Sequence, residues 1–353
     1  MNQETIAYKK WDKPVPPERI LIVRLHAIGD VSLTIPASNS LRKLLSGSRI
    51  DFFTDELSAP LVNSVEIFNN IYSFKSYSFI NHAEDSFRVR MNKIKEIKKW
   101  STLLKENKYD VVIDLQSNRV SKLLRFLMGG TYYSEFDKFS PKPASLRTLN
   151  SFHLAGFENV TNDCDIKIKT EISARAKELL NENLKQYENS KLILLNPAGL
   201  WTTRNWPIEN YVSLAKLMLA DENVNFLILG NDRIAEKAKY LEQNLGDSVI
   251  NLTNKTTLDE AFALFQFIDA SISEDSALLH FSWASGVPTL ALLGSTRSDW
   301  TSPQPPHGAS FSSSDLPCGD CMQSVCKYGD VHCLTRISPE EVYEKLKGMM
   351  FKT

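Results

Sequence analysis

An aspartate directly follows the first strongly apolar segment of the chain, within Arg24-Leu-His-Ala-Ile-Gly29-Asp30. The segment before it predicts a strand and the pattern after it predicts a helix. Asp30 is therefore expected at a helix N-terminus, where the helix dipole favours a carboxylate. Gly29 would permit the tight turn between the two elements. At that position Asp30 could take a proton from an attacking hydroxyl group, or it could only cap the helix.

The turn before Asp30 lacks the glycine patterns of phosphate-binding loops, since neither G-x-G-x-x-G nor G-x-x-x-x-G-K occurs in the chain. An acidic residue without such a loop suits a site that binds an acceptor better than a site that binds a nucleotide. A nucleotide site is therefore expected elsewhere in the chain.

A candidate nucleotide site lies in the C-terminal half. Gly199 follows a predicted strand and allows the backbone to approach a ligand closely. Arg204, in the next loop, could bind phosphate through two parallel hydrogen bonds, although a lone loop arginine is usually only solvated. Ser276 and Ala277 begin a predicted helix, whose free amides form an anion-binding position.

Two side chains beside this helix start could complete the site. Asp275 could bind a sugar hydroxyl or an amino group of the base, whereas His280, one turn into the helix, is as consistent with packing as with ligand contact. The turn 294–296 (Gly-Ser-Thr) ends the next predicted strand on the same edge of the sheet. Three loops would then converge on one patch, which favours a site more than any single motif does.

Strand-length apolar runs alternate with helical patterns along the chain. Strands buried on both faces have nearly continuous apolar runs, and their alternation with helices predicts α/β domains with doubly wound parallel sheets. The predicted strands are 20–25, 49–54, 110–115, 191–196, 225–229, 248–252, 270–272 and 288–293. The predicted helices are 31–45, 118–128, 171–187, 208–219, 233–245, 258–268, 277–285 and 338–349.

The alternation falls into two Rossmann-like halves, predicted as domains 1–187 and 188–337, with 1–19 as a leader extension. Residues 338–353 are expected to form a C-terminal helix that packs back toward the N-terminal domain. Ligands of such folds bind beyond the carboxyl ends of the strands. Two such domains facing a central cleft would therefore hold both substrates there.

Composition and charge exclude several classes of protein. The formal net charge of −1 argues against an electrostatic nucleic-acid binder, so no nucleic acid is expected as a partner. The N-terminus has no apolar core of signal-peptide length, and no run of eighteen apolar residues predicts a transmembrane helix. We therefore expect a cytoplasmic protein whose membrane contact, where it occurs, is peripheral.

Four of the five cysteines form a cluster with the spacing Cys318-x₂-Cys321-x₄-Cys326-x₆-Cys333. In a reducing compartment such a cluster is more consistent with thiols or bound metal than with disulfides. The number of ligands suits structural zinc, although the spacing is tighter and less regular than in a zinc ribbon. Structural zinc and free thiols both stay open, whereas a catalytic metal is not expected, because four thiolates leave no open coordination position.

Taken in order, these motifs resemble those of glycosyltransferase family 9, the heptosyltransferases. Residues 20–36 (ILIVRLHAIGDVSLTIP) resemble the opening of that family, 197–207 (PAGLWTTRNWP) its nucleotide-phosphate loop, and 273–280 (SEDSALLH) its D-[ST]-G-x-x-H segment. The cysteine cluster and Ile337-Ser-Pro-Glu-Glu-Val are also similar to family features. The resemblance covers about residues 20 to 347.

The resemblance implies a GT-B fold with an N-terminal acceptor-binding domain and a C-terminal nucleotide-sugar-binding domain. It also implies an inverting transfer that requires no metal ion, from an ADP-sugar donor, ADP-heptose, to an inner-core sugar of lipopolysaccharide. By motif, Asp30 would be the general base and Arg204 the phosphate-binding residue. Asp275, Ser276 and Ala277 would contact the donor. Ala277 stands where the family usually has glycine, which would narrow the approach to a phosphate.

Two alternatives stay open from the sequence. The same fold and mechanism could use another nucleotide-sugar donor, or the chain could be a non-catalytic module that binds nucleotides or glycans. The joint presence of Asp30, Arg204 and Asp275 argues against a degenerate site.

A basic segment, 88–108, has two interpretations. The simpler one is a solvated helix face; the functional one is a dock for phosphorylated lipid A or for an anionic membrane at the inner face of the inner membrane. Lys138, Lys142 and Arg147 could add to such a dock. The basic residues of the segment are Arg88, Arg90, Lys93, Lys95, Lys98, Lys99, Lys105 and Lys108.

Overall fold

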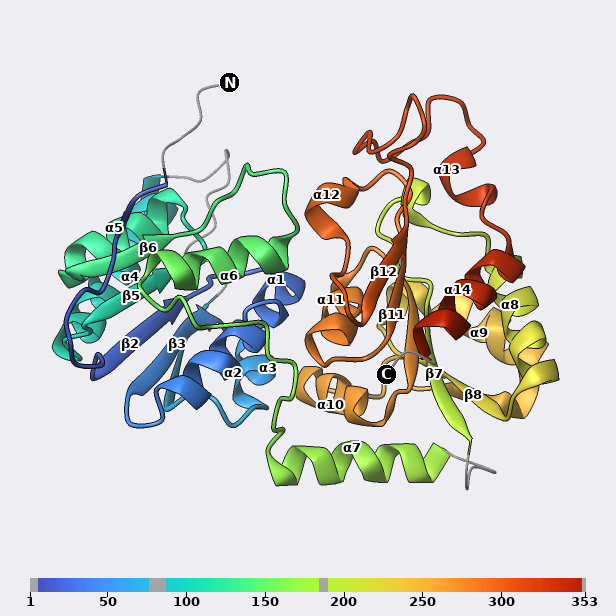
Figure 1. Cartoon of the computed structure of the whole chain (residues 1–353), viewed down its shortest axis with the longest axis horizontal. Coiled ribbons are helices and arrows are strands. Elements are labelled where there is room, and N and C mark those ends of the chain that lie inside the picture. Colours follow the sequence, from blue (N-terminus) through green and yellow to red (C-terminus); the bar gives the residue numbers. More distant parts are fainter. Residues whose placement is uncertain (1–5, 76–86, 184–189, 351–353) are drawn as a thin grey trace. The chain divides into compact units, whose positions relative to one another are not determined.

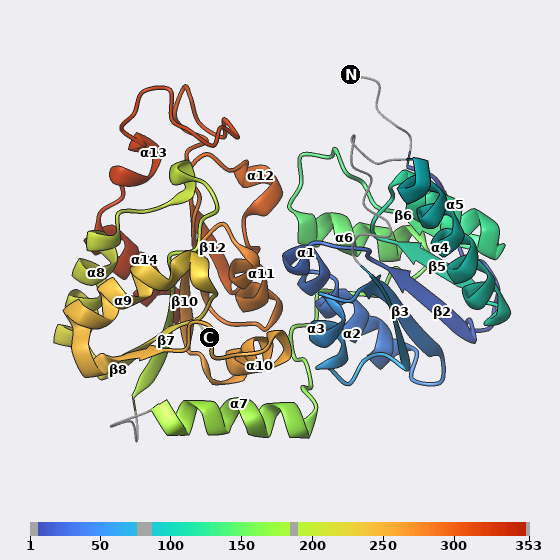
Figure 2. The same ribbon diagram turned by 180° about the vertical axis from the view of Figure 1, so that it is seen from behind.

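The computed structural model describes residues 6–75, 87–183 and 190–350, and its backbone is shown in Figures 1 and 2. The chain divides into two compact units, the first ending at Lys167 and the second beginning at Ile168. Each unit contains one six-stranded sheet with helices around it. The predicted α/β class and its two doubly wound sheets are confirmed.

The sheet of the first unit has the order β1-β6-β5-β2-β3-β4, and every neighbouring pair is parallel except β1 with β6. From β2 the chain runs outward to β3 and β4, then returns to β5 on the other side of β2. The switch point of the winding therefore lies between the carboxyl ends of β2 and β5. The strands are β1 (Tyr8–Lys9), β2 (Arg19–Val23), β3 (Arg49–Asp55), β4 (Asn70–Phe74), β5 (Val111–Asp114) and β6 (Tyr132–Glu135).

Helices cover this sheet because its central strands are apolar on both faces. Successive strand residues point to opposite faces, so Leu21 and Val23 contact one layer of helices while Ile20 and Ile22 are buried on the other. The first layer consists of α4 and α5, whose buried residues join Leu21 and Val23 in one core cluster. The helices are α1 (Ile28–Ser32), α2 (Ile35–Leu44), α3 (Ala59–Asn63), α4 (Phe87–Glu106), α5 (Arg119–Met128) and α6 (Ala144–Leu154).

The sheet of the second unit is parallel throughout, with the order β12-β11-β10-β7-β8-β9. This is the strand order of a complete Rossmann-type sheet, and its switch point lies between β7 and β10. The strands are β7 (Lys191–Asn196), β8 (Val224–Ile228), β9 (Val249–Asn251), β10 (Ala270–Glu274), β11 (Thr289–Leu292) and β12 (Gly308–Phe311). The helices are α7 (Thr170–Asn183), α8 (Ile208–Asp221), α9 (Ala235–Leu245), α10 (Leu258–Ala263), α11 (Ala277–Ala284), α12 (Ser298–Thr301), α13 (His332–Thr335) and α14 (Pro339–Met350).

The leader 1–19 supplies part of the first sheet. Its strand β1 pairs with β6, and the Trp11 amide donates a hydrogen bond of 2.9 Å to the carbonyl of Ala155. The Trp11 ring is largely buried and packs edge-on against Tyr132, with 4.9 Å between ring centroids. The described part of the leader therefore completes the edge of the sheet.

The chain passes between the units before α7, whereas the sequence places the domain boundary after this helix. The predicted boundary at 187/188 itself lies outside the described residues. Helix α7 packs against α10 of the second unit. Arg175 on α7 also pairs with Asp259 at 3.0 Å and Glu260 at 3.1 Å. These contacts assign α7 to the second unit.

The C-terminal helix α14 packs against α8 of the second unit, whereas the sequence analysis expected it to pack back toward the N-terminal domain. Figures 1 and 2 show the two helices side by side. Val342 and Leu346, one turn apart, are fully buried in the same core as Trp206. The Trp206 indole N–H also donates to the carbonyl of Ile337 at 3.0 Å. The apolar face of α14 is thus buried in the core of the second unit.

In the described part of the chain, no helix is both long enough and apolar enough to cross a membrane.

Candidate functional site

Asp30 lies in α1, just beyond the carboxyl end of β2 and therefore at the switch point of the first sheet. One of its carboxylate oxygens, Oδ2, accepts a charge-assisted hydrogen bond from Nη2 of Arg24. The Nη1 group of the same Arg24 donates to the carbonyl of Leu115, which follows β5, at 2.5 Å. The Asp30 side chain is 39% exposed. Arg24 therefore fixes the carboxylate in place while leaving it accessible to a ligand.

The tight turn before Asp30 is made by Ala27. Its φ of 72° lies in the left-handed region, which costs an alanine about 1–2 kcal/mol. Gly29, the expected turn residue, is instead the second residue of α1. The strained conformation of Ala27 turns the chain sharply from β2 into α1, so that Asp30 reaches Arg24.

His26 is a titratable residue at the carboxyl end of β2 that the sequence analysis did not single out. The Leu25 amide donates to Oε1 of Gln116 at 3.1 Å, so the Gln116 amide nitrogen faces Nε2 of His26, also at 3.1 Å. Because that amide nitrogen can only donate, Nε2 of His26 must be the unprotonated acceptor. Burial, assisted by the charge of Arg24, lowers the pKa of His26. A neutral imidazole thus lies beside Asp30 and its arginine.

In the second unit, Glu274 holds the loop that contains Gly199 and Arg204. Glu274 ends β10 and is fully buried. Its carboxylate accepts from the amide of Gly199 at 2.7 Å and from the amide of Trp206, also at 2.7 Å. A Cβ atom on residue 199 would come within 2.4 Å of the Arg204 carbonyl oxygen, so only glycine fits there. Glu274 lies within the segment 273–280 but was not predicted as a site residue, because a glutamate at a strand end is not by itself a functional signal.

Asn196 and Ser276 link β7 and β10, the two central strands of the second sheet, at their carboxyl ends. Nδ2 of Asn196, the last residue of β7, donates to the hydroxyl groups of Ser273 at 2.6 Å and Ser276 at 2.7 Å. Ser276 precedes α11 without a side-chain hydrogen bond to the helix. The first amides of α11, including that of Ala277, are thus left for an anion. His280 lies one turn further into α11 and is half-buried.

Arg204 and Asp275, predicted as separate donor contacts, form an ion pair in the structure. Nη1 of Arg204 is 2.7 Å from Oδ2 of Asp275, and both side chains are largely buried. The Thr296 hydroxyl donates to the same Oδ2 at 2.7 Å. The guanidinium carbon lies 3.8 Å from the centroid of the Trp201 ring, and Nε of Arg204 is buried with no hydrogen-bond partner in the described structure. The three predicted loops therefore converge.

Lys237 on α9 adds a second cation to this edge. Its Nζ donates to the carbonyl of Pro197 at 2.7 Å and to the side chain of Asn205, and it lies 3.8 Å from Oε2 of Glu274. Burial lowers the pKa of Lys237. This lysine could not be identified from the sequence, because it lies within an ordinary charged helix far from the loop in the chain. The residues around the 197–207 loop, namely Asn196, Gly199, Arg204, Lys237, Glu274, Asp275, Ser276, Ala277 and Thr296, are called the cradle below.

The four C-terminal cysteines line one cavity of about 560 Å³ beside the cradle. They are free thiols, and among the described residues no group of three or more His, Cys, Asp or Glu side chains is arranged to hold a metal ion. Hydrogen bonds from backbone amides lower the pKa of Cys326, whereas burial raises the pKa of Cys333. The segment also supports the cradle, since the Thr203 hydroxyl donates to the carbonyl of Gln323 at 2.6 Å.

Comparison with known proteins decides the family. A family model described as glycosyltransferase family 9 (heptosyltransferase) matches residues 97–332, which include the whole cradle. The chain belongs to glycosyltransferase family 9. It is therefore a glycosyltransferase.

Relatives and solved structures agree with this assignment. The glycosyltransferase is 26% identical to lipooligosaccharide heptosyltransferase 2 of Campylobacter jejuni, over 79% of this chain and 87% of that protein. It is 23% identical to lipopolysaccharide heptosyltransferase 1 of Pseudomonas aeruginosa, over 94% and 98% of the two chains. Its fold is similar to that of the glycosyl transferase family 9 from Veillonella parvula, with a TM-score of 0.76, 20% identity, and 95% and 98% of the chains covered. The Escherichia coli heptosyltransferase WaaC with ADP-2-deoxy-2-fluoro heptose gives a TM-score of 0.60 at 18% identity, over 94% and 99%. The chain thus has the GT-B fold of these enzymes.

The buried carboxyl group of Glu274 predicts that the stability of this glycosyltransferase falls as the pH rises toward neutrality. Burial raises the pKa of Glu274 from 4.5 to about 7, against the opposing effects of Lys237 and of the two amides. Between these values the folded protein retains a proton that the unfolded chain has released, so the folded state loses stability as the pH rises through this window. Relative to Glu274→Gln, the native protein should lose about 2 kcal/mol of unfolding free energy between about pH 5 and pH 8. Urea unfolding at the two pH values measures this difference.

The exposed Glu209→Gln variant is the matched control for removing one carboxylate from the second unit. If the difference between native protein and Glu274→Gln is the same at both pH values, the raised pKa is contradicted.

Proposed function

We propose that this glycosyltransferase transfers a heptose from ADP-heptose to a lipopolysaccharide inner-core sugar or a related glycan acceptor. The observation that carries the proposal is the cradle, where two cations and the start of α11 meet at one switch point. This arrangement suits the diphosphate of a nucleotide sugar. The two curated relatives are named heptosyltransferases, and the E. coli structure is described with an ADP-heptose analogue. These names favour ADP-heptose over another nucleotide sugar as the donor.

The donor diphosphate would bind against Arg204 and the amides of Ser276 and Ala277. Asp275, which now pairs with Arg204, would then be free to bind a sugar hydroxyl or the base. The unpartnered Nε of Arg204 supports this assignment, since a buried donor without a partner is costly unless a ligand satisfies it. His280 would lie one turn behind the phosphate position. Gly199 leaves room for the loop to close against Arg204.

The chemical step would be an inverting displacement that needs no metal ion. Asp30 would take the proton of the acceptor hydroxyl as its oxygen bonds to the anomeric carbon and the bond to ADP breaks. Arg204 and the α11 amides would stabilise the negative charge on the departing diphosphate. Arg24 supports the base role of Asp30, because it holds the carboxylate with one oxygen left for a substrate.

The cysteine cluster belongs to a separate part of the proposal, which is structural. A zinc ion held by the four thiolates would fix the segment that supports the Thr203 end of the cradle, and it would take no part in transfer. The thiols would first have to draw closer together than in the described structure. A cytoplasmic location, where such thiols stay reduced, is part of the same proposal.

Arg204→Ala should weaken binding of ADP by about tenfold to a hundredfold, because one charged hydrogen bond contributes about 1.5–3 kcal/mol. Isothermal titration calorimetry with ADP measures the change. Lys239→Ala, which removes an exposed positive charge from α9, is the matched control and should bind ADP normally. Unchanged affinity in Arg204→Ala would remove Arg204 from the donor site, and tighter binding of UDP or GDP than of ADP would favour another donor.

Asp30→Asn should keep ADP affinity and lose nearly all transfer, because the amide cannot accept the hydroxyl proton. Release of ADP from ADP-heptose in the presence of an inner-core acceptor measures turnover. Asp165→Asn, an exposed change in the same unit, should retain full activity. If Asp30→Asn turns over at the native rate, the base is another group, and the neutral His26 becomes the next to test.

Protein purified without chelators should contain about one zinc ion per chain by plasma mass spectrometry, if the four thiolates form one tetrahedral site. The double variant Cys318→Ser/Cys321→Ser should lose this metal, whereas Cys164→Ser should keep it. Native protein free of bound metal would show that the cluster consists of thiols only.

A further inference from the structure

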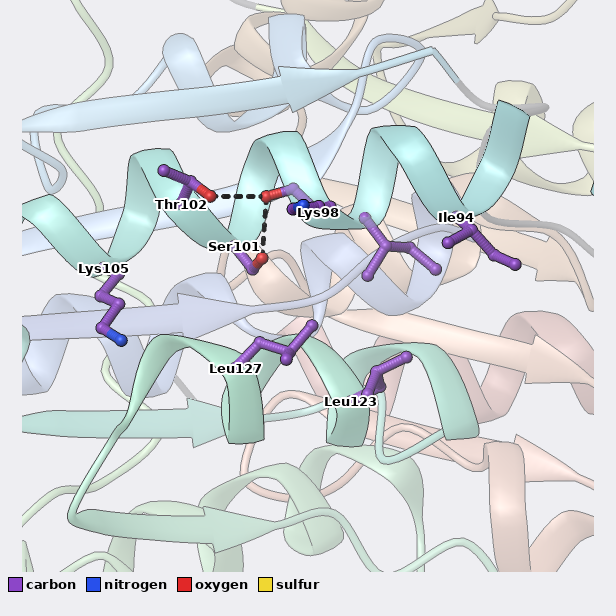
Figure 3. Close-up of a pocket in the computed structure, with 8 residues that line it drawn as sticks. Ile94, Lys98, Ser101, Thr102, Lys105, Leu123 and Leu127 are labelled. Atoms are coloured by element: carbon purple, nitrogen blue, oxygen red, sulfur yellow. Dashed lines mark hydrogen bonds between the residues drawn. The ribbon is translucent and has the colours of Figure 1, made fainter. Parts of the chain in front are cut away.

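An open groove runs between α4 and α5 on the outside of the first unit. It has a volume of about 370 Å³. Its apolar lining comes from Ile94 and Ile97 on α4 and from Leu123 and Leu127 on α5, with Lys98 and Lys105 among the residues around it. Figure 3 shows Leu123 and Leu127 pointing toward α4, and Lys105 reaching from α4 toward α5. The lining is thus mainly apolar with two lysines, and no carboxylate from the described part of the chain contributes to it.

The same two helices expose further large apolar side chains. Phe126 is 79% exposed, and Ile94 is 57% exposed. Phe126 and Leu127 follow Leu123 on α5 by three and four residues, so both lie on the helix face of Leu123. Large apolar side chains that gather in one exposed patch mark an interaction surface more often than a solvated face. The interpretation of this region as only a solvated helix face is therefore incomplete.

The charge of the two helices sets them apart from the rest of the chain. Helices α4 and α5 contain ten basic residues and two acidic residues, whereas the whole chain has a formal net charge of −1. Glu135 partly neutralises Lys122 at 3.0 Å and Arg125 at 2.5 Å. Among the described contacts, Lys98 and Lys105 beside the groove form no such ion pair with a carboxylate. A negatively charged partner would complement this face.

We infer that the exposed face of α4 and α5 docks the protein on an anionic lipid bilayer. Lysines attract the charged headgroups, while Phe126, Leu123 and the groove take up apolar lipid, and this combination is typical of membrane-surface helices. A polyanion such as a nucleic acid would use the lysines but would leave the apolar residues in water. The inference deepens the proposed function, because a lipopolysaccharide acceptor is attached to lipid.

Vesicle binding tests the docking face directly. Full-length protein is mixed with phosphatidylcholine vesicles, with or without about a third of phosphatidylglycerol, and the bound fraction is measured by flotation. We expect binding to the anionic vesicles that weakens as salt is raised, and little binding to the neutral ones. Leu123→Ser/Phe126→Ser should weaken binding by about tenfold or more, since two large apolar side chains lose their burial. Lys98→Gln/Lys105→Gln should weaken binding by about fivefold for each lysine at low salt.

Matched controls come from exposed residues elsewhere. Leu44→Ser on α2 and Lys216→Gln/Lys239→Gln on α8 and α9 should bind the vesicles like the native protein. If the serine variant binds as tightly as native protein while the lysine variant does not, the attraction is by charge alone, the apolar side chains do not enter lipid, and the inference is overturned. Native protein that does not bind anionic vesicles also overturns it.

The stabilisation of each variant by ADP in a thermal unfolding scan separates this inference from the proposed function. All docking variants should retain the native ADP-induced shift, because their changes lie in the first unit, whereas every residue of the cradle belongs to the second. Loss of vesicle binding with an intact ADP shift concerns the docking face only, whereas native protein that ADP does not stabilise contradicts the proposed function instead.

Discussion

The arrangement of the cradle depends on one buried carboxylate. Glu274 ends the strand at the centre of the second sheet and accepts hydrogen bonds from the backbone on both sides of Arg204, at Gly199 and at Trp206. A buried acid is costly unless such donors surround it, and burial here raises its pKa to about 7 in spite of them. In return, the hydrogen bonds from the Gly199 and Trp206 amides fix the conformation of the 197–207 loop, whose only regular structure is one short 3-10 turn. Without that loop, Arg204 would not lie against Asp275, and the amides of α11 would have no cation opposite them.

In the first unit a buried arginine, Arg24, has the role that the buried glutamate Glu274 has in the second. Arg24 follows the central strand β2, is largely buried, and links the carbonyl after β5 to the carboxylate of Asp30. In both sheets, a buried charged side chain thus joins the two strands at which the winding reverses. Doubly wound sheets leave a crevice at this point, because the connections on either side lead away from it. The buried charge holds the functional residues at the crevice in a defined position, where catalysis or binding can use them.

Most of the fold could be predicted from the sequence, because apolar runs such as 191–196 are long and continuous enough to indicate buried strands. The strands β1, β4, β6 and β12 were missed since they are short and partly polar, and their pairing depends on neighbours far away in the chain. Within the cradle, Gly199, Arg204 and Asp275 could be found because they belong to recognisable loops. Glu274 and Lys237 could not, since a single acid at a strand end and a single lysine on a helix acquire meaning only when folding brings them within 3.8 Å of each other. The ion pair of Arg204 with Asp275 could not be predicted either, because the two residues lie far apart in the chain and meet only on folding.

The central claim is that the cradle binds the diphosphate of the donor. Hydrogen exchange measured by mass spectrometry, with and without saturating ADP, tests it most directly, because a bound anion protects the amides that it contacts. The account predicts that ADP slows exchange in residues 197–207 and at the start of α11, around Ser276 and Ala277, and leaves α4 and α5 unchanged. Protection confined to the first unit, or no protection in the 197–207 loop when ADP is bound, would contradict it.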